Sequence, residues 1–254
     1  MYKNNNPWFV CHKTVLHTRL RLFCFHFAGG GASFCRDWGN YLPAGIELIA
    51  IQLPGREQRY GEPFHTRATS VVDTLLQIMI ENDYLDAPCV FFGHSMGTII
   101  SYELIRLIKK QHLEQPLLYI PSGMKPPHLS NHETPIHALP DLEFCREFLK
   151  KEHSDRLESI FNDDEMRDFF LPMIKADTEL VETYTFEDAT PFDCPITAFT
   201  GVDDQDVPEA QLLEWARHTT GTFKYHCFPG DHFYIETAKD EMLSTLNREI
   251  SRFL

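Results

Sequence analysis

The sequence predicts an α/β fold, in which a mostly parallel sheet carries helices on both faces and an inserted group of helices. Two observations predict it. Short apolar runs typical of strands alternate with stretches whose apolar residues recur at helical spacing, a pattern typical of a parallel sheet covered on both faces. The chain has 254 residues, 43% of them hydrophobic, which is enough for one large domain with a sizeable core.

The expected elements follow one another in a regular order. Strands are indicated by apolar and aromatic runs over 20–27, 46–53, 89–92, 117–120, 194–200 and 222–228. Helices are indicated by apolar residues three and four positions apart over 69–79, 99–108, 209–218 and 238–254. Residues 1–13 indicate a loose or edge-forming start.

The alternation of strands and helices stops between about residues 125 and 188. Helical stretches replace it, at 142–151, 164–175 and 176–184. We therefore expect a helical lid over 124–189, inserted into a core formed by 14–123 and 190–254. The lid has more apolar residues than one face needs, so they either line an acyl pocket or pack the lid itself. They are Phe144, Phe148, Leu149, Phe161, Met166, Phe169, Phe170 and Met173.

Composition and charge argue against several classes of function. The formal net charge of −14 argues against general nucleic-acid binding, which needs a basic face. No apolar run approaches the roughly 20 residues that cross a bilayer, and the polar start of the chain lacks a signal-peptide pattern. The seven cysteines form no C-x-x-C pair, so free thiols in a reducing cytoplasm are expected. We expect a monomer with no metal and no cofactor of its own.

A glycine-flanked serine lies between an apolar strand and a helix. Residues 93–97 read Gly-His-Ser-Met-Gly, which is the Gly-x-Ser-x-Gly pattern of a sharp strand-to-helix turn. Gly93 and Gly97 fit there because a side chain would collide with the neighbouring strand or helix. The alternative is an ordinary loop with a serine N-cap. The context predicts Ser95 as the nucleophile.

A glycine-rich loop, residues 28–33, directly follows the first expected strand. It matches neither G-x-G-x-x-G nor the phosphate-binding pattern that ends in lysine, so phosphate binding is not favoured. We expect instead that the backbone N–H of Ala28 faces a substrate carbonyl. The second donor of such an oxyanion hole would be the N–H of Met96, directly after the nucleophile.

A serine needs a base to take its proton, and the base needs an acid that fixes its tautomer. Ser95, Asp204 and His232 each follow an expected strand, so they should meet at the carboxyl edge of the sheet. Their order in the chain is Ser, Asp, His, as this architecture requires. Asp203 and Asp206 share the loop with Asp204, and Asp203 is the main alternative acid.

Thirteen histidines compete for the role of base, and most of them are expected at the surface. His232 is favoured because it lies in a tight, glycine-containing turn after the last strand. His94 is next to the nucleophile but precedes the acid in the chain. His128, His132 and His137 could form a metal cluster, but no set of Cys, Asp or Glu partners accompanies them.

A polar loop follows the strand over 46–53. Arg56, Glu57 and Arg59 in this loop either reach the rim of the site or form a solvated set of charges.

Taken together, these segments resemble the type II (external) thioesterases that accompany nonribosomal peptide and polyketide synthases, members of the α/β-hydrolase superfamily. The resemblance extends along the full length of the chain. It lies in residues 25–30, 53–57, 92–97, 126–128, 169–177, 201–204 and 228–233.

The resemblance implies a function and a set of site residues. The family's nucleophile, acid and base match Ser95, Asp204 and His232, and its oxyanion donors match the amides of Ala28 and Met96. Such enzymes hydrolyse short or misprimed acyl groups from the phosphopantetheine arm of carrier domains. Phosphopantetheine would thus arrive as part of the substrate, and an acyl or peptidyl carrier protein would be the partner.

Two positions depart from the family pattern. His26 stands where proline is common, and Asp231 stands where glycine is common, just before the expected base. A carboxylate at Asp231 would raise the pKa of His232 if it pointed inward, but exposure to solvent is expected. Because carrier domains are usually acidic, as this chain is, docking would need a local apolar or basic patch, for which the lid is one place.

Two other classes of function compete with a carrier-directed thioesterase. A general carboxylesterase or lipase would use the same triad. A non-catalytic binding protein with a hydrolase fold would be expected to have lost Ser95, Asp204 or His232, and all three are present.

Overall fold

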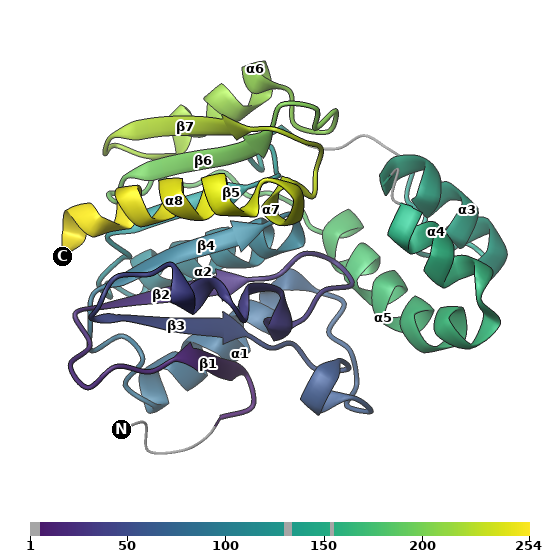
Figure 1. The fold of residues 1–254 in the computed structure, drawn as a ribbon, viewed down its shortest axis with the longest axis horizontal. Coiled ribbons are helices and arrows are strands. Elements are labelled where there is room, and N and C mark those ends of the chain that lie inside the picture. Colours follow the sequence, from purple (N-terminus) through teal and green to yellow (C-terminus); the bar gives the residue numbers. More distant parts are fainter. Residues whose placement is uncertain (1–5, 130–133, 153–154) are drawn as a thin grey trace.

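The strands form one twisted sheet through the middle of the molecule. The computed structural model describes residues 6–129, 134–152 and 155–254. Within those residues the strand order is β1-β3-β2-β4-β5-β6-β7, and all neighbours are parallel except β1 and β3 (Figure 1). The bounds are β1 Phe9–Lys13, β2 Leu20–Phe25, β3 Ile46–Ile51, β4 Cys89–His94, β5 Leu118–Ser122, β6 Ile196–Gly201 and β7 Phe223–Phe228. The expected parallel sheet is thus confirmed. The antiparallel edge strand β1 lies before residue 14, where the core was expected to begin.

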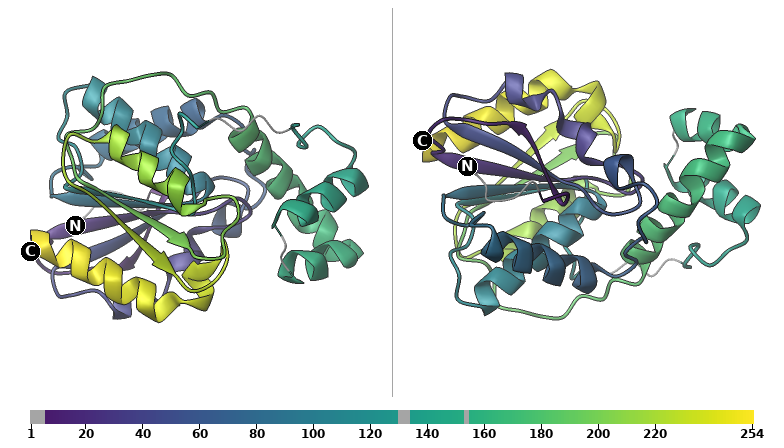
Figure 2. Two further views of the ribbon diagram at one scale, coloured as in Figure 1. Left: turned by 90° about the horizontal axis from the view of Figure 1, so that it is seen from above. Right: turned by 90° about the horizontal axis from the view of Figure 1, so that it is seen from below.

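Helices cover both faces of the sheet, because its central strands are apolar on both sides (Figure 2). On β2, Phe23 and Phe25 point into the core beneath α1 (Ala68–Glu81) and α2 (Met96–Lys110). Leu22 and Cys24 point to the opposite core, beneath α8 (Lys239–Ile250). The burial of every residue of β2 explains why its sequence is an unbroken apolar run rather than an alternating one.

Three helices lie between β5 and β6 in the chain, beyond the carboxyl ends of the parallel strands (Figure 1). They are α3 (Asp141–Glu152), α4 (Asp155–Asn162) and α5 (Asp164–Glu182). They have a small core of their own, which includes Phe144, Phe148, Phe161 and Leu171. We call α3, α4 and α5 the helical segment.

The helical segment departs from the sequence prediction between residues 175 and 176. Two helices were expected over 164–175 and 176–184, but α5 is a single helix that continues through Pro172. A proline removes one hydrogen bond inside a helix, yet Pro172 is exposed, so water can take the place of the missing donor. The short helix α4 was not predicted. The helix expected over 209–218 is α6 (Glu209–Leu212) followed by a 3₁₀ helix (Leu213–His218).

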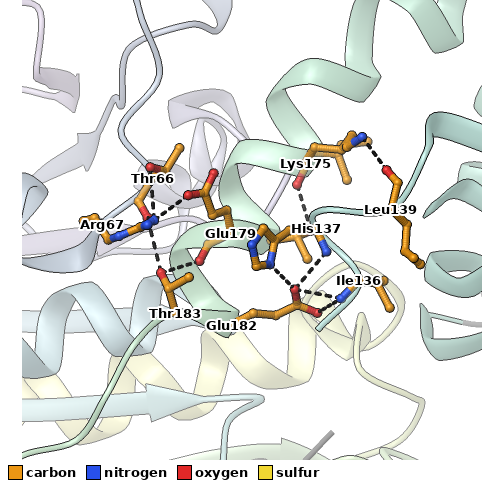
Figure 3. A network of polar contacts seen from close by, with 11 residues as sticks. Thr66, Arg67, Ile136, His137, Leu139, Lys175, Glu179, Glu182 and Thr183 are labelled. Carbon is orange, nitrogen blue, oxygen red and sulfur yellow. Dashed lines mark hydrogen bonds and ion pairs between the residues drawn. The ribbon is translucent and has the colours of Figure 1, made fainter. Parts of the chain in front are cut away.

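Within the helical segment, α5 contacts the rest of the molecule (Figure 3). At its carboxyl end Glu182 accepts hydrogen bonds from the backbone N–H groups of Ile136 and His137 and lies 2.7 Å from His137 Nδ1. On another side Glu179 pairs with Arg67, which comes just before α1. Leu180 packs into the core beneath α1 and α2. The second half of α5 therefore belongs to the body of the molecule.

The remaining helices of the described residues are short. They are α7 (Tyr234–Thr237) before α8 and the 3₁₀ helices Ala32–Cys35, Trp38–Asn40, Glu57–Arg59 and Ser251–Phe253. No helix among the described residues combines the length and the apolarity that crossing a membrane requires.

Candidate active site

Ser95 lies at the sharp turn between β4 and α2. Its backbone has φ 53° and ψ −121°, a conformation that costs a non-glycine residue free energy and is typical of functional turns. Its N–H donates to the Ser122 carbonyl at 2.8 Å, which ties the turn to the neighbouring strand β5. The side chain is half-buried at the carboxyl edge of the sheet. The geometry matches that expected of the predicted nucleophile.

The glycines around Ser95 are required by close contacts between backbone segments. A Cβ on Gly97 would lie 2.1 Å from the Phe25 carbonyl oxygen, and one on Gly93 would lie 2.4 Å from the Gly97 carbonyl oxygen. Neither backbone can move without displacing β2 or α2. The predicted reason for these two glycines is therefore confirmed, and it lies in packing rather than in a positive φ.

We expect Gly97→Ala to destabilise the protein by about 3 kcal/mol or to prevent folding, because the new methyl group meets fixed backbone. Urea unfolding at pH 7.5 measures the change. Gly61→Ala is the control, since Gly61 has φ +88° and open space around it, so it shows what a left-handed backbone alone costs. A Gly97→Ala protein as stable as Gly61→Ala would contradict the packing argument.

His232 and Asp204 lie within hydrogen-bond distance of one another. His232 Nδ1 is 3.0 Å from Asp204 Oδ2, and since a carboxylate only accepts, Nδ1–H donates. Asp204 is 6% exposed, and its other oxygen accepts the N–H of Asp206 at 3.1 Å. Asp203 is exposed. The structure thus brings two of the three predicted triad residues together and favours Asp204 over Asp203 as the acid.

Ring contacts place His232 beside the turn that carries Ser95. The rings of His232 and His94 have centroids 5.1 Å apart, and His94 directly precedes Ser95. Gly123 fills the space next to both rings: a Cβ there would lie 2.7 Å from His94 Cε1 and 3.3 Å from His232 Cε1. His232 and Asp204 therefore lie beside the turn that carries Ser95.

His94 is a packing neighbour rather than a base. It is completely buried, and its Nδ1 lies 2.8 Å from Ser122 Oγ. Burial, and then the neighbouring His232, keep the pKa of His94 well below its ordinary value. A neutral ring in contact with Ser122 is held in place and has no access to solvent.

The two predicted oxyanion donors lie in the loop after β2 and at the first position of α2. Met96 is the first residue of α2, so its N–H has no acceptor within the helix. Ala28 lies in the loop after β2, and the next residue, Gly29, donates its N–H to Asp177 Oδ2 at 2.8 Å. Phe27 in the same loop packs edge-on against Phe233, with centroids 5.3 Å apart. The glycine-rich loop therefore lies beside the turn of His232.

A cavity of about 480 Å³ opens next to the glycine-rich loop. Residues of the loop, Arg56, and Phe169, Phe170 and Met173 of α5 line it. Tyr60 stacks on Phe169 with ring centroids 4.9 Å apart. A larger hollow of about 970 Å³ over α1 and the carboxyl end of α2 contains none of the predicted site residues. The lining of the smaller cavity also lacks Ser95, Asp204 and His232, but it includes Phe27 and Gly29, the two residues on either side of Ala28.

The apolar residues of the helical segment divide between the two expected uses. Phe169, Phe170 and Met173 line the cavity. Phe144, Phe148 and Phe161 are buried inside the segment, and Leu149 packs against them. Met166 is 43% exposed.

Arg56 and Arg59 are buried, with exposed fractions of 4% and 6%, so the solvated alternative is wrong for both. Arg56 forms a two-pronged ion pair with Asp177 of α5, at 2.7 and 2.8 Å. Sequence reasoning did not single out Asp177. One signal was available, because Asp177 lies four residues after Met173 and three before Leu180, on the apolar face of α5.

His26, the first departure from the family pattern, is 2% exposed. Its Nδ1–H donates to the Phe27 carbonyl at 2.8 Å, and its Nε2 has no partner among the described residues. Burial, and then the positive charge of Arg56, lower the pKa of His26 to about 4. The imidazole is therefore neutral at neutral pH.

Acid is expected to destabilise the folded protein through His26. The unfolded chain binds a proton below about pH 6.5, the ordinary histidine pKa, whereas folded His26 binds one only below about pH 4. The free energy of unfolding therefore falls as the pH drops between these values. For this single group the loss from pH 7.5 to pH 5 is about 2 kcal/mol.

His26→Asn removes the titrating group and keeps a donor for the Phe27 carbonyl. In urea unfolding, the variant should lose about 2 kcal/mol less than the wild type between the two pH values. His17→Asn, at an exposed side chain, is the control. Equal losses in the wild type and His26→Asn would refute the assignment.

Two of the three histidines considered as a metal cluster, and not favoured as one, have separate partners. His128 Nδ1 lies 2.7 Å from His218 Nε2, and His137 pairs with Glu182. His132 is outside the described residues. Among the residues that the structure describes, no group of three or more His, Cys, Asp or Glu could hold a metal ion.

Asp231, the second departure from the family pattern, is exposed, as expected. Its Oδ1 accepts the N–H of Phe233 at 2.8 Å, so it shapes the turn around His232.

Comparison with known proteins places the chain in a family. Residues 20–250 match the family model of the thioesterase domain. The chain belongs to this family. It is 35% identical over 245 residues to the gramicidin S biosynthesis protein GrsT of Aneurinibacillus migulanus, which covers 96% of this chain and 94% of that protein. It is 33% identical over 249 residues to a protein named linear gramicidin dehydrogenase LgrE of Brevibacillus parabrevis, covering 97% of this chain and 94% of that protein.

Solved structures agree with this placement. The type II thioesterase BorB from the borrelidin biosynthetic cluster matches with a TM-score of 0.84 and 26% identity, over 97% of this chain and 98% of that chain. The α/β-hydrolase fold and the thioesterase family expected from the sequence are therefore confirmed.

Proposed function

We propose that this protein is a type II thioesterase that hydrolyses short or misprimed acyl groups from the phosphopantetheine arm of carrier domains in natural-product biosynthesis. The observation that supports it most is the Asp204–His232 pair at 3.0 Å beside the Ser95 turn, in a chain of the thioesterase family. Relatives of similar length are named for gramicidin S biosynthesis and for the borrelidin cluster. These names support a carrier-bound substrate.

The site supports a mechanism in two steps. In the first, Ser95 Oγ attacks the thioester carbonyl while His232 Nε2 takes its proton and Asp204 holds the ring. The N–H groups of Ala28 and Met96 stabilise the developing oxyanion, and the thiol leaves with a proton from His232. In the second step His232 activates water, which releases the acid from Ser95. Phosphopantetheine enters and leaves with the carrier, so the protein needs no cofactor of its own.

The partner in this proposal is an acyl or peptidyl carrier protein. Because the chain has a net charge of −14, long-range attraction to an acidic carrier is not expected. Tyr60 and Phe169, which are 65% and 52% exposed, offer local apolar surface at the cavity instead. All seven cysteines are free thiols, which supports a reducing cytoplasm as the place of action.

The dehydrogenase name of one relative raises the question of dinucleotide binding. In dinucleotide-binding loops, backbone N–H groups after the first strand face a pyrophosphate. Here the N–H of Gly29 is taken by the Asp177 carboxylate, whose charge would repel a pyrophosphate. The residues of this loop therefore favour hydrolysis over dinucleotide chemistry.

The test compares the hydrolysis of one acyl group from three substrates of increasing size. Acetyl is presented as an oxygen ester, as a thioester of N-acetylcysteamine, and on the phosphopantetheine arm of a carrier protein. The proposal expects kcat/KM to rise at each step, by about 100-fold or more from the oxygen ester to the loaded carrier. Faster turnover of the oxygen ester would indicate a general carboxylesterase. No turnover of any of the three would favour a non-catalytic binding protein.

A further inference from the structure

The glycine-rich loop is held from outside by side chains of α5 and of the loop after β3. Asp177 Oδ2 accepts the N–H of Gly29 at 2.8 Å, and Arg56 Nη1 donates to the Gly30 carbonyl at 3.1 Å. Gly29 has φ +76°, and a Cβ there would lie 3.2 Å from Ile174 Cγ1. Each of these contacts involves either Gly29 or Gly30, the two residues that directly follow Ala28.

The ion pair between Arg56 and Asp177 is completely enclosed. Asp177 is 0% exposed and Arg56 is 4% exposed. Removing two charges from water is costly, so a buried pair by itself is weak support for stability. It persists where further hydrogen bonds satisfy its remaining atoms. Here those bonds go to backbone groups of Gly29, Gly30 and Pro54. The hydrogen bonds that satisfy the pair therefore form only when the loop has this conformation.

The position of Asp177 is in turn fixed by the body of the molecule. Two residues further along α5, Glu179 pairs with Arg67, and at the end of the helix Thr183 Oγ1 lies 3.5 Å from the Thr66 carbonyl oxygen (Figure 3). These contacts anchor the second half of α5 on the loop before α1. The Asp177 carboxylate is thus held by two sets of contacts. One is its ion pair with Arg56, and the other fixes α5 to the loop before α1.

We propose that Asp177, held by Arg56, is a positioning residue for the oxyanion hole. By accepting the N–H of Gly29 it fixes the peptide that follows Ala28, and so aims the N–H of Ala28 at the oxyanion. The inference rests on the proposed function only in taking Ala28 as an oxyanion donor. It assigns to α5, a helix of the predicted lid, a part in the rate of the chemical step.

Two double variants separate positioning from stability. Arg56→Met with Asp177→Asn removes both charges and keeps a side-chain oxygen that can accept the N–H of Gly29. Arg56→Met with Asp177→Leu also removes both charges but offers no acceptor. Because neither variant leaves a lone buried charge, both are expected to fold. Their difference reports on the acceptor alone.

The readouts are chosen to follow the oxyanion hole. Hydrolysis of p-nitrophenyl acetate and of an acetyl thioester gives kcat and KM. Binding of a trifluoromethyl ketone, which forms a tetrahedral adduct with the serine, reports the oxyanion hole without turnover. Thermal unfolding of each variant is recorded beside these measurements.

The variant with asparagine should keep kcat within about 5-fold of the wild type, whereas the one with leucine should lose about 10- to 100-fold. KM should change little, and affinity for the ketone should fall in parallel with kcat. Equal kcat in the two double variants, or a loss that follows thermal stability instead of the acceptor, would overturn the inference. A wild type that cleaves the oxygen ester and ignores the thioester would overturn the proposed function and still leave the inference testable.

Discussion

Ser95→Ala is expected to lower kcat for the loaded carrier by about 10⁵-fold, because loss of the nucleophile removes the covalent route entirely. The residue lies at the turn between β4 and α2 with φ 53°, and the backbone of the turn is held by the Ser122 carbonyl and by contacts of Gly93 and Gly97. Since none of these contacts involves the Ser95 side chain, the fold should survive the change.

The measurement is release of free carrier thiol over time, with the same preparation followed by circular dichroism and thermal unfolding. Ser251→Ala, at an exposed serine near the carboxyl end, is the control and should act like the wild type. A Ser95→Ala protein that keeps more than about a hundredth of the wild-type kcat would refute the assignment of Ser95 as the nucleophile.

The sheet could be predicted from the sequence because its strands are buried on both faces. All residues of β2, β3 and β4 are buried, so each reads as an unbroken apolar run bounded by turn residues. The serine turn was predictable for a related reason. Gly93 is required by the first turn of α2 and Gly97 by the backbone of Phe25 on β2, and their fixed spacing around the serine is visible in the chain.

The helical segment was harder to predict, because its boundaries depend on solvent and on distant contacts. The boundary expected between residues 175 and 176 does not exist, because α5 continues unbroken from Asp164 to Glu182. The pairing of Arg56 with Asp177 joins residues 121 positions apart in the chain. Such a contact leaves no periodic pattern in the sequence. The one indication of it was that Asp177 lies on the apolar face of α5.

The choice of the acid shows a different kind of limit. Asp203 and Asp204 are neighbours in one loop, and composition and spacing describe them equally well. The backbone after β6 separates them: the N–H of Asp203 donates to the Gly230 carbonyl at 3.0 Å, while the side chain of Asp204 points inward to His232. One carboxylate is buried and the other is exposed. The structure therefore predicts different effects for substitutions of Asp203 and Asp204, which sequence reasoning could only rank as candidate acids.

Asp204→Asn is expected to lower kcat by about 10⁴-fold, whereas Asp203→Asn should stay within about 3-fold of the wild type. An amide at position 204 that offers its N–H₂ to His232 Nδ1 would hold the ring in the tautomer whose Nε2 is protonated, and such a ring cannot take the proton of Ser95. Asparagine still has an oxygen for the N–H of Asp206, which Asp204 accepts at 3.1 Å, so the loop should keep its shape.

The comparison is made from kcat on the acetyl thioester, measured from pH 6 to pH 9 for both variants. The loss in Asp204→Asn should be partly recovered at high pH, as hydroxide replaces the missing base, while Asp203→Asn should follow the wild-type profile throughout. A large loss in Asp203→Asn with little change in Asp204→Asn would reverse the assignment of the acid. Large losses in both would mean that the loop after β6 acts as a unit, with Asp203 holding the turn from which Asp204 reaches His232.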